Sequence, residues 1–188
     1  MIQEIAAICS VINGGYYYQP HVVRKILNED GDVIKDVQPV VTKQTVSSDV
    51  SALIRQYMGT VMESDGTGAA AKVDGYSMGG KTGTAQKYPR EDKKYLVSFI
   101  GFAPLDDPQV VVYVVVDEPN TEYQADSLYA QYIYKGVMTE ILPYLNIFQD
   151  EEVTDKANAK MTYLENLINQ QAESNRQSDS TDDTTTAA

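Results

Sequence analysis

The chain has 188 residues, about the length of one domain, and 43% of them are hydrophobic, enough to bury a core. Fifteen basic against 27 acidic residues give a net charge of -12, which argues against a nucleic-acid partner, because gripping a phosphate backbone needs clustered cations. One cysteine and one histidine leave no material for a disulfide, a zinc cluster or a histidine-based triad. We therefore expect no metal and no cofactor.

The first predicted element is a helix over residues 2–12, where apolar residues recur at helical spacing before the stop signal Asn13-Gly14-Gly15. A helix that starts at the first residue leaves its backbone donors uncapped, which we interpret as a sign of truncation. Next, residues 22–27 and 33–37 flank an Asp30-Gly31 turn. This pattern predicts a small β-hairpin.

The clearest helical pattern covers residues 50–62, with Ser47 or Ser48 available as the cap and glycines following near Gly66-Thr67-Gly68. Two runs of β-branched and aromatic residues, 95–102 and 109–116, are then joined by a proline-containing turn. They predict a second hairpin. Its second strand is apolar without alternation, so we expect cover on both of its faces.

A last helix is predicted over residues 127–146, with Asp126 as a candidate cap. Gly136 would be a weak point in it or a close contact between helix and sheet. Residues 149–188 form an acidic tail rich in Ser and Thr that we expect to be largely disordered. The sequence also contains no window of about 18 apolar residues that could span a membrane.

The segment Gly79-Gly80-Lys81-Thr82-Gly83-Thr84-Ala85-Gln86 can be interpreted in two ways. Counted from Gly75, it matches the pattern of a phosphate-binding P-loop, and Asp117 at the end of an apolar strand imitates a magnesium-binding aspartate. A P-loop requires a helix that begins at its Lys-Thr pair, however, and the residues after Thr82 are poor helix formers. The hairpin-linked strands that follow also differ from the parallel strands of a nucleotide-binding sheet.

The same segment suits an edge strand whose glycines let a substrate backbone come close. Lys81 would hold a carboxylate as a point charge, and the Thr82 and Thr84 hydroxyls would donate hydrogen bonds to it. Such charge-assisted contacts contribute about 1.5 to 3 kcal/mol each. The chemistry indicated is recognition of a carboxylate-bearing ligand.

In its sequence order, this Lys-Thr-Gly-Thr-Ala segment resembles the third active-site motif of the transpeptidase domain of class B penicillin-binding proteins. Gly66-Thr67-Gly68 precedes it, and Phe99-Ile100-Gly101-Phe102-Ala103-Pro104, a valine-rich strand and Asp117-Glu118-Pro119 follow it, as in that family. The resemblance covers residues 1–148, the C-terminal half of the domain. It implies an α/β fold of the α+β type: an antiparallel sheet with flanking helices, part of the serine β-lactamase and transpeptidase fold.

The resemblance also implies the activity, a peptidoglycan D,D-transpeptidase that cross-links stem peptides and is acylated by β-lactams. Lys81 resembles the motif lysine, Thr82 and Thr84 the ligands of the substrate carboxylate, and the Thr84 N–H one half of the oxyanion hole. Gly83 would keep the strand clear of the substrate. The expected partners are stem peptides, β-lactams and the missing N-terminal half of the domain, at the extracytoplasmic face of a bacterial membrane, with the anchor outside this sequence.

Two motifs of the family are missing from these 188 residues. No serine is followed by lysine three residues later, and no Ser-x-Asn occurs. Tyr144-Leu145-Asn146 matches a Tyr-x-Asn variant only in the wrong order. We therefore expect the chain alone to be inactive. A non-catalytic module that binds peptide carboxylates through Lys81 remains an alternative, and a P-loop protein a weaker one.

Overall fold

The computed structural model describes residues 1–153, so the expected disorder of residues 149–188 falls almost entirely outside the described residues. The helices are α1 (Ile2–Ile12), α2 (Ser48–Thr60) and α3 (Leu128–Tyr144), with short 3-10 turns η1 (Ala69–Ala71) and η2 (Arg90–Asp92). The strands are β1 (Tyr16–Tyr18), β2 (Lys25–Leu27), β3 (Val33–Asp36), β4 (Val41–Gln44), β5 (Gly79–Gln86), β6 (Tyr95–Ala103) and β7 (Val110–Asp117).

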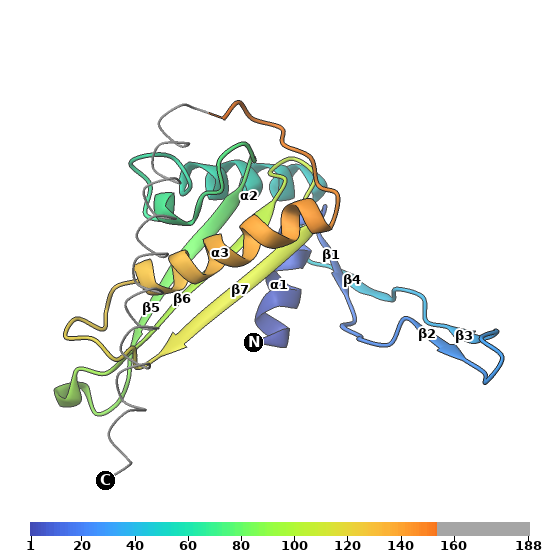
Figure 1. The fold of residues 1–188 in the computed structure, drawn as a ribbon, viewed down its shortest axis with the longest axis horizontal. Coiled ribbons are helices and arrows are strands. Elements are labelled where there is room, and N and C mark those ends of the chain that lie inside the picture. The colour runs from blue at the N-terminus through green and yellow to red at the C-terminus, as the bar shows by residue number, and fades with distance from the viewer. Residues whose placement is uncertain (154–188) are drawn as a thin grey trace, which may run out of the picture. The chain divides into compact units, whose positions relative to one another are not determined.

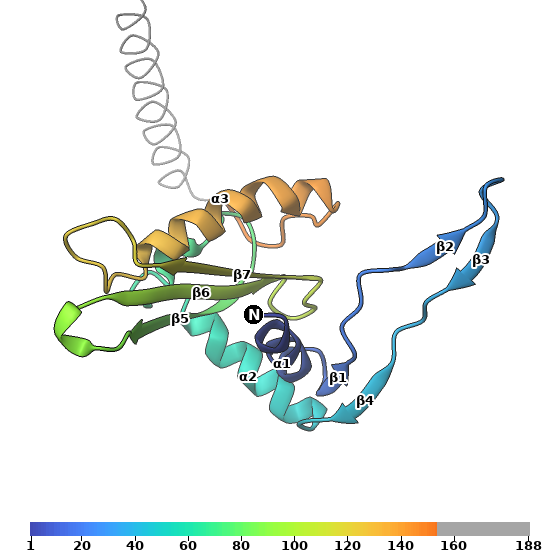
Figure 2. The ribbon, with the colours of Figure 1, turned by 90° about the horizontal axis from the view of Figure 1, so that it is seen from below.

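An antiparallel sheet in the order β5-β6-β7 forms the centre of residues 1–150. Figure 2 shows α3 on one face of this sheet and α1 and α2 on the other. Every β7 residue from Val110 to Val116 is half-buried, between α3 and α1. The α+β architecture, with an antiparallel sheet and flanking helices, is as predicted.

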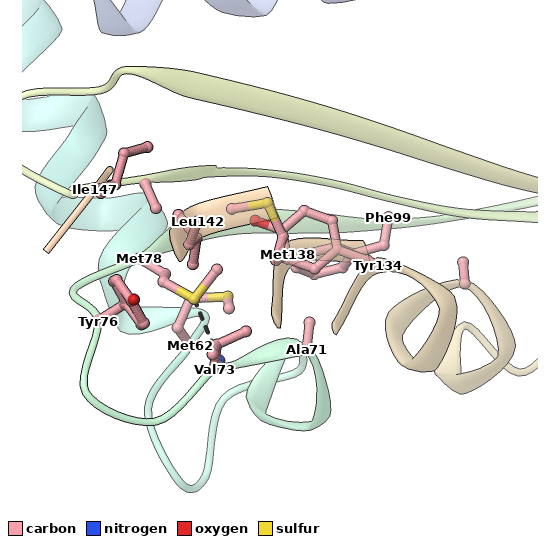
Figure 3. Packing of buried hydrophobic residues seen from close by; sticks show 12 residues of the cluster. Met62, Ala71, Val73, Tyr76, Met78, Phe99, Tyr134, Met138, Leu142 and Ile147 are labelled. Carbon is pink, nitrogen blue, oxygen red and sulfur yellow. Dashed lines mark hydrogen bonds between the residues drawn. The ribbon is translucent and has the colours of Figure 1, made fainter. Parts of the chain in front are cut away.

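The main core lies between the sheet and α3 (Figure 3). The Phe99 ring of β6 meets the Tyr134 ring of α3 edge to face, with ring centroids 4.8 Å apart. Burial raises the pKa of the Tyr134 hydroxyl, because the charged phenolate would lose its hydration. Beside them, the Val73 amide donates to the sulfur of Met78 at 3.2 Å. This packing joins the loop before β5 to the same core.

The predicted capping side chains lie at the starts of α2 and α3, but the N-cap of α3 is Ser127 rather than Asp126, and α2 ends at Thr60, before the predicted glycines. The Ser47 hydroxyl accepts from the Val50 amide at 3.3 Å, and the Asp126 carboxylate accepts from the Leu128 amide at 2.9 Å. The chain leaves α1 through two glycines with positive φ, Gly14 and Gly15. Gly136 differs from one expectation: it is exposed and has open space around it, so it makes no close contact with the sheet.

Residues 16–44, which we name the arm, extend away from the sheet and helices (Figure 1). Strand β1 pairs with β4 near the sheet and helices, and β2 pairs with β3 further out, where the first hairpin was expected at residues 22–27 and 33–37. At the turn, the Asn28 carboxamide oxygen accepts from the Asp30 and Asp32 amides at 3.1 and 2.7 Å. Gly31 has φ +88° there, a conformation that favours glycine.

Parts of the apolar surface of α1 and α2 are exposed. Ile2 of α1 and Leu53 and Tyr57 of α2 expose about half or more of their surface, whereas Ile12 and Met62 are buried. No helix among residues 1–153 is long and apolar enough to cross a membrane.

Two glycines provide a matched test of the packing of α3 on β6. In Gly101→Ala the added methyl group overlaps the Tyr134 hydroxyl, and we expect a loss of about 1–3 kcal/mol in the free energy of unfolding. In Gly136→Ala the methyl group meets nothing within 4 Å, and higher helix propensity should add about 0.5–1 kcal/mol. Urea unfolding of both variants checks the pair; a Gly101→Ala chain as stable as the parent would contradict the packing of α3 on β6.

Candidate active site

The Lys81 segment forms β5, which lies at the margin of the three-stranded sheet and pairs only with β6 among the described strands. Lys81 lies opposite Ile100, Thr82 opposite Phe99, and Thr84 opposite Val97. An edge strand leaves every second backbone N–H and C=O unpaired by its own sheet. The motif is therefore presented along an open strand edge.

Glycines let β5 lie directly on the aromatic side chains of β6. A Cβ atom at Gly80 would overlap the Phe99 ring, and one at Gly79 would overlap the Phe102 ring. Both rings are fully buried. Gly83 has a further reason to be glycine, because a Cβ atom there would overlap the Ser98 hydroxyl. The strand is thus fixed from behind while its outer edge stays open.

The polar groups of the motif lie close together on this strand. The Lys81 ammonium donates to the Thr82 carbonyl oxygen at 3.0 Å and to the Thr82 hydroxyl at 3.4 Å. Lys81 and Thr84 are exposed, and Thr82 and Gly83 are half-buried. Successive strand residues point to opposite faces, so Lys81 and Gly83 share one face and Thr82 and Thr84 the other. A cation and two hydroxyls are available to an anionic ligand at this edge.

The start of β5 is held by the segment that follows α3. The Asp150 carboxylate accepts from the Ser77 amide at 2.6 Å and from the Ser77 hydroxyl. The Ser77 oxygen in turn accepts from the Leu105 amide at 3.0 Å, and the Asp150 amide donates to the Gly75 carbonyl at 3.0 Å. These bonds join three separate parts of the chain two residues before β5.

The far end of β5 is held by ion pairs. The Lys87 ammonium lies 2.9 Å from the Asp117 carboxylate and 2.7 Å from that of Glu118, and Lys94 lies 3.2 Å from Glu118. The bond from Lys87 lowers the pKa of Glu118, and the bond to Glu118 raises that of Lys87. The Asp117-Glu118 pair is thus part of an ion-pair cluster at the end of β5 and β7.

The P-loop alternative is wrong. Lys81 and Thr82 lie inside β5, which pairs antiparallel with β6, and no helix begins at them. A phosphate cradle needs a helix N-terminus at that point, with its amides directed at the anion. Among residues 1–153 there is also no group of three or more His, Cys, Asp or Glu side chains placed to hold a metal ion.

Gly66-Thr67-Gly68 lies behind the strand rather than along its edge. A Cβ atom at Gly68 would press on the Phe99 ring, and the Gln131 side chain of α3 donates to the Thr67 carbonyl at 3.0 Å. This loop therefore supports β5 through the core. Sequence reasoning missed the Ser77–Asp150 contact, and the only available signal was a serine two residues before the Gly79-Gly80-Lys81 segment.

Most of the chain is similar in sequence to known transpeptidases. The penicillin-binding protein transpeptidase domain family matches residues 1–139. Stage V sporulation protein D of Bacillus subtilis is 41% identical over 152 residues, which cover 78% of this chain and 23% of that protein. The probable peptidoglycan D,D-transpeptidase PenA of Neisseria flavescens is 32% identical over 144 residues, which cover 72% of this chain and 36% of that protein.

Solved structures agree with the sequence matches. Penicillin-binding protein 3 of Mycobacterium tuberculosis, in complex with ampicillin, matches with a TM-score of 0.69 at 25% identity, over 80% of this chain and 36% of that one. The chain thus spans a minor part of the length of these relatives. It belongs to the class B penicillin-binding proteins, and it forms part of their transpeptidase domain.

Proposed function

We propose that residues 1–148 supply the carboxylate-binding wall of a peptidoglycan D,D-transpeptidase site. The observation that carries this is β5 itself, an edge strand on which Lys81, Thr82 and Thr84 lie next to an open side. The stem peptide of peptidoglycan ends in a carboxylate. β-Lactams, which mimic that peptide, carry a carboxylate as well. The relative solved with ampicillin supports β-lactams as ligands of the complete domain.

In this proposal Lys81 attracts the substrate carboxylate and the two hydroxyls orient it. Lys81 is exposed, and within the described part of the chain its ammonium donates only to the neighbouring Thr82, so it can turn to a ligand. Thr82 and Thr84 then donate from the other face of the same strand edge. A carboxylate bound by these three groups gains charge-assisted hydrogen bonds of about 1.5–3 kcal/mol each.

The Thr84 N–H is assigned to the oxyanion hole. Half of the amides of an edge strand are directed away from the sheet, where they can stabilise the negative charge that develops on a tetrahedral intermediate. Removal of one such donor costs about 2.7–4 kcal/mol of transition-state stabilisation. The backing of β5 by the Phe99 and Phe102 rings suits this role, because a preorganised donor needs a strand that does not move.

The nucleophile of the proposed reaction is not among these 188 residues, since no Ser-x-x-Lys or Ser-x-Asn occurs in them. We infer that catalysis requires the part of the domain that carries those motifs, packed against the exposed faces of α1 and α2. The working location would be the extracytoplasmic face of a bacterial membrane, as for a cell-wall enzyme.

The first test uses the chain alone. We expect no covalent uptake of a fluorescent penicillin and no mass increase after incubation with it, because no serine has an activating lysine one helical turn away. Intact-protein mass spectrometry checks this, with Bacillus subtilis stage V sporulation protein D as a comparison protein. Acylation of any serine in the chain would refute the proposal of inactivity.

The same sample can be titrated with a D-alanyl-D-alanine peptide. Saturable binding that disappears in Lys81→Ala would favour the non-catalytic module, in which the strand binds carboxylates without turnover. The absence of binding would favour a wall that works only inside the complete domain.

The second test assigns the site residues. In a chimera, residues 1–148 replace the aligned segment of Bacillus subtilis stage V sporulation protein D. We expect the chimera to be acylated by fluorescent penicillin, and Lys81→Ala to slow acylation by about 10- to 150-fold, the equivalent of one charge-assisted contact.

Lys35→Ala is the matched control, because Lys35 is an exposed lysine of the arm. It should leave the acylation rate unchanged. A Lys81→Ala chimera that is acylated at the parental rate would remove Lys81 from the site.

A further inference from the structure

The outer part of the arm exposes apolar side chains that have no role in the core. Ile26, Leu27, Val33 and Ile34 are 46–67% exposed, and none belongs to the core cluster. They lie on β2 and β3, which pair only with each other and extend away from the body (Figure 2). A two-stranded ladder exposed on both sides is marginally stable in water. These residues therefore lack a partner within the described chain.

The charges of the arm are divided along its length. We call residues 28–32 the tip and residues 21–26 and 34–39 the shaft. Acidic residues gather at the tip and basic residues on the shaft, where the one acidic residue is Asp36. Among residues 1–153 no ion pair joins the two groups. The members are Glu29, Asp30 and Asp32 at the tip, and Arg24, Lys25 and Lys35 on the shaft.

A hollow of about 440 Å³ lies beside the shaft. His21, Arg24 and Lys25 line it from the segment that leads into β2, and residues 36–39 line it from the end of β3 and the segment that follows. Arg24 and Lys25 are exposed, and neither belongs to the ion pairs found among residues 1–153. An acidic turn is a chemically suitable occupant. The tip of a second copy is such a turn, because it carries three carboxylates within five residues, and the tip cannot fold back onto the shaft of its own hairpin.

We propose that the arm is a surface for self-association, on which the arm of a second copy lies antiparallel. A two-fold axis near Leu27 and Val33 brings the tip of each copy over the shaft of the other. The exposed apolar residues then meet in the middle, and acidic tips face basic shafts at both ends. Two arms arranged in parallel would instead place tip against tip and repel.

The contact should be modest in strength and sensitive to salt. Exposed ion pairs contribute little each and are screened, so the charges mainly select the arrangement, while the apolar residues supply the attraction. The tip needs little further ordering, because the Asn28 side chain already accepts from two tip amides.

The test uses charge reversal at both ends of the arm in the full 188-residue chain. One variant carries Glu29→Lys and Asp30→Lys at the tip; the other carries Arg24→Glu and Lys35→Glu on the shaft. Each variant alone would place like charges opposite one another, and we expect its dimer to be about tenfold weaker or more by sedimentation velocity at low salt.

An equimolar mixture of the two variants is the decisive sample. In a mixed dimer the reversed tip faces the reversed shaft, and the native tip faces the native shaft, so both ends attract again. We expect association to return to within about threefold of the parent chain, because the charge products at both ends are restored.

The control reverses Asp106 and Asp107, exposed residues of the turn between β6 and β7, to lysine, and should leave association unchanged. Self-association through the exposed faces of α1 and α2 would not change with any of the charge reversals on the arm. The proposal is overturned by a monomeric parent chain, by reversed variants that associate as the parent does, or by a mixture no stronger than its components. None of these outcomes bears on Lys81 and the proposed carboxylate site.

Discussion

The close packing of β5 on β6 is the constraint on which the candidate site depends. Two fully buried rings, Phe99 and Phe102, occupy the volume that side chains at Gly80 and Gly79 would need. Phe99 is held in turn by Tyr134 of α3. Protein interiors are close-packed, so a displacement of β5 would open a void against these rings. The polar motif thus lies at the sheet margin, yet the start of its strand rests on the core.

Both ends of β5 are fixed by polar contacts of different kinds. Before the strand, Ser77 is bonded to Asp150 and to the Leu105 amide; after it, Lys87 is paired with Asp117 and Glu118. A strand anchored at both ends and backed by the core is a rigid element, and binding groups carried by rigid elements are positioned more accurately than groups on loops. Lys81 and the threonines lie between these anchors, where side-chain freedom remains but backbone freedom is small.

Much of this fold could be predicted because its signals are local. Helical spacing and the Ser47 cap located α2, and a turn between apolar runs located the β6–β7 hairpin. The contacts that fix the site were not predictable in this way. Ser77 and Asp150 are 73 residues apart, and Gln131 and Thr67 are 64 apart. Serine and aspartate are ordinary loop residues, so nothing in their neighbourhoods marks them as partners.

The roles of glycine show the same limit. The motif predicts glycines that spare room for a substrate, but the structure adds a second reason, the aromatic rings and the Ser98 hydroxyl behind the strand. Which side chain of β6 lies under which glycine depends on register, and register is set by pairing across the sheet. The Lys81 segment alone does not contain that information.

The arm is ordered by different contacts from those that hold the sheet and helices together. Its turn is ordered by Asn28 and its base by the pairing of β1 with β4, while Ile26 and Ile34 stay about half exposed or more. Exposed apolar strands that serve no fold are templates for uncontrolled pairing. The division of charge limits this hazard, because parallel alignment of two arms opposes like charges. In the antiparallel alignment the acidic tip of each arm faces the basic shaft of the other. Both tips are then paired within the dimer, so neither is left to bind a third copy.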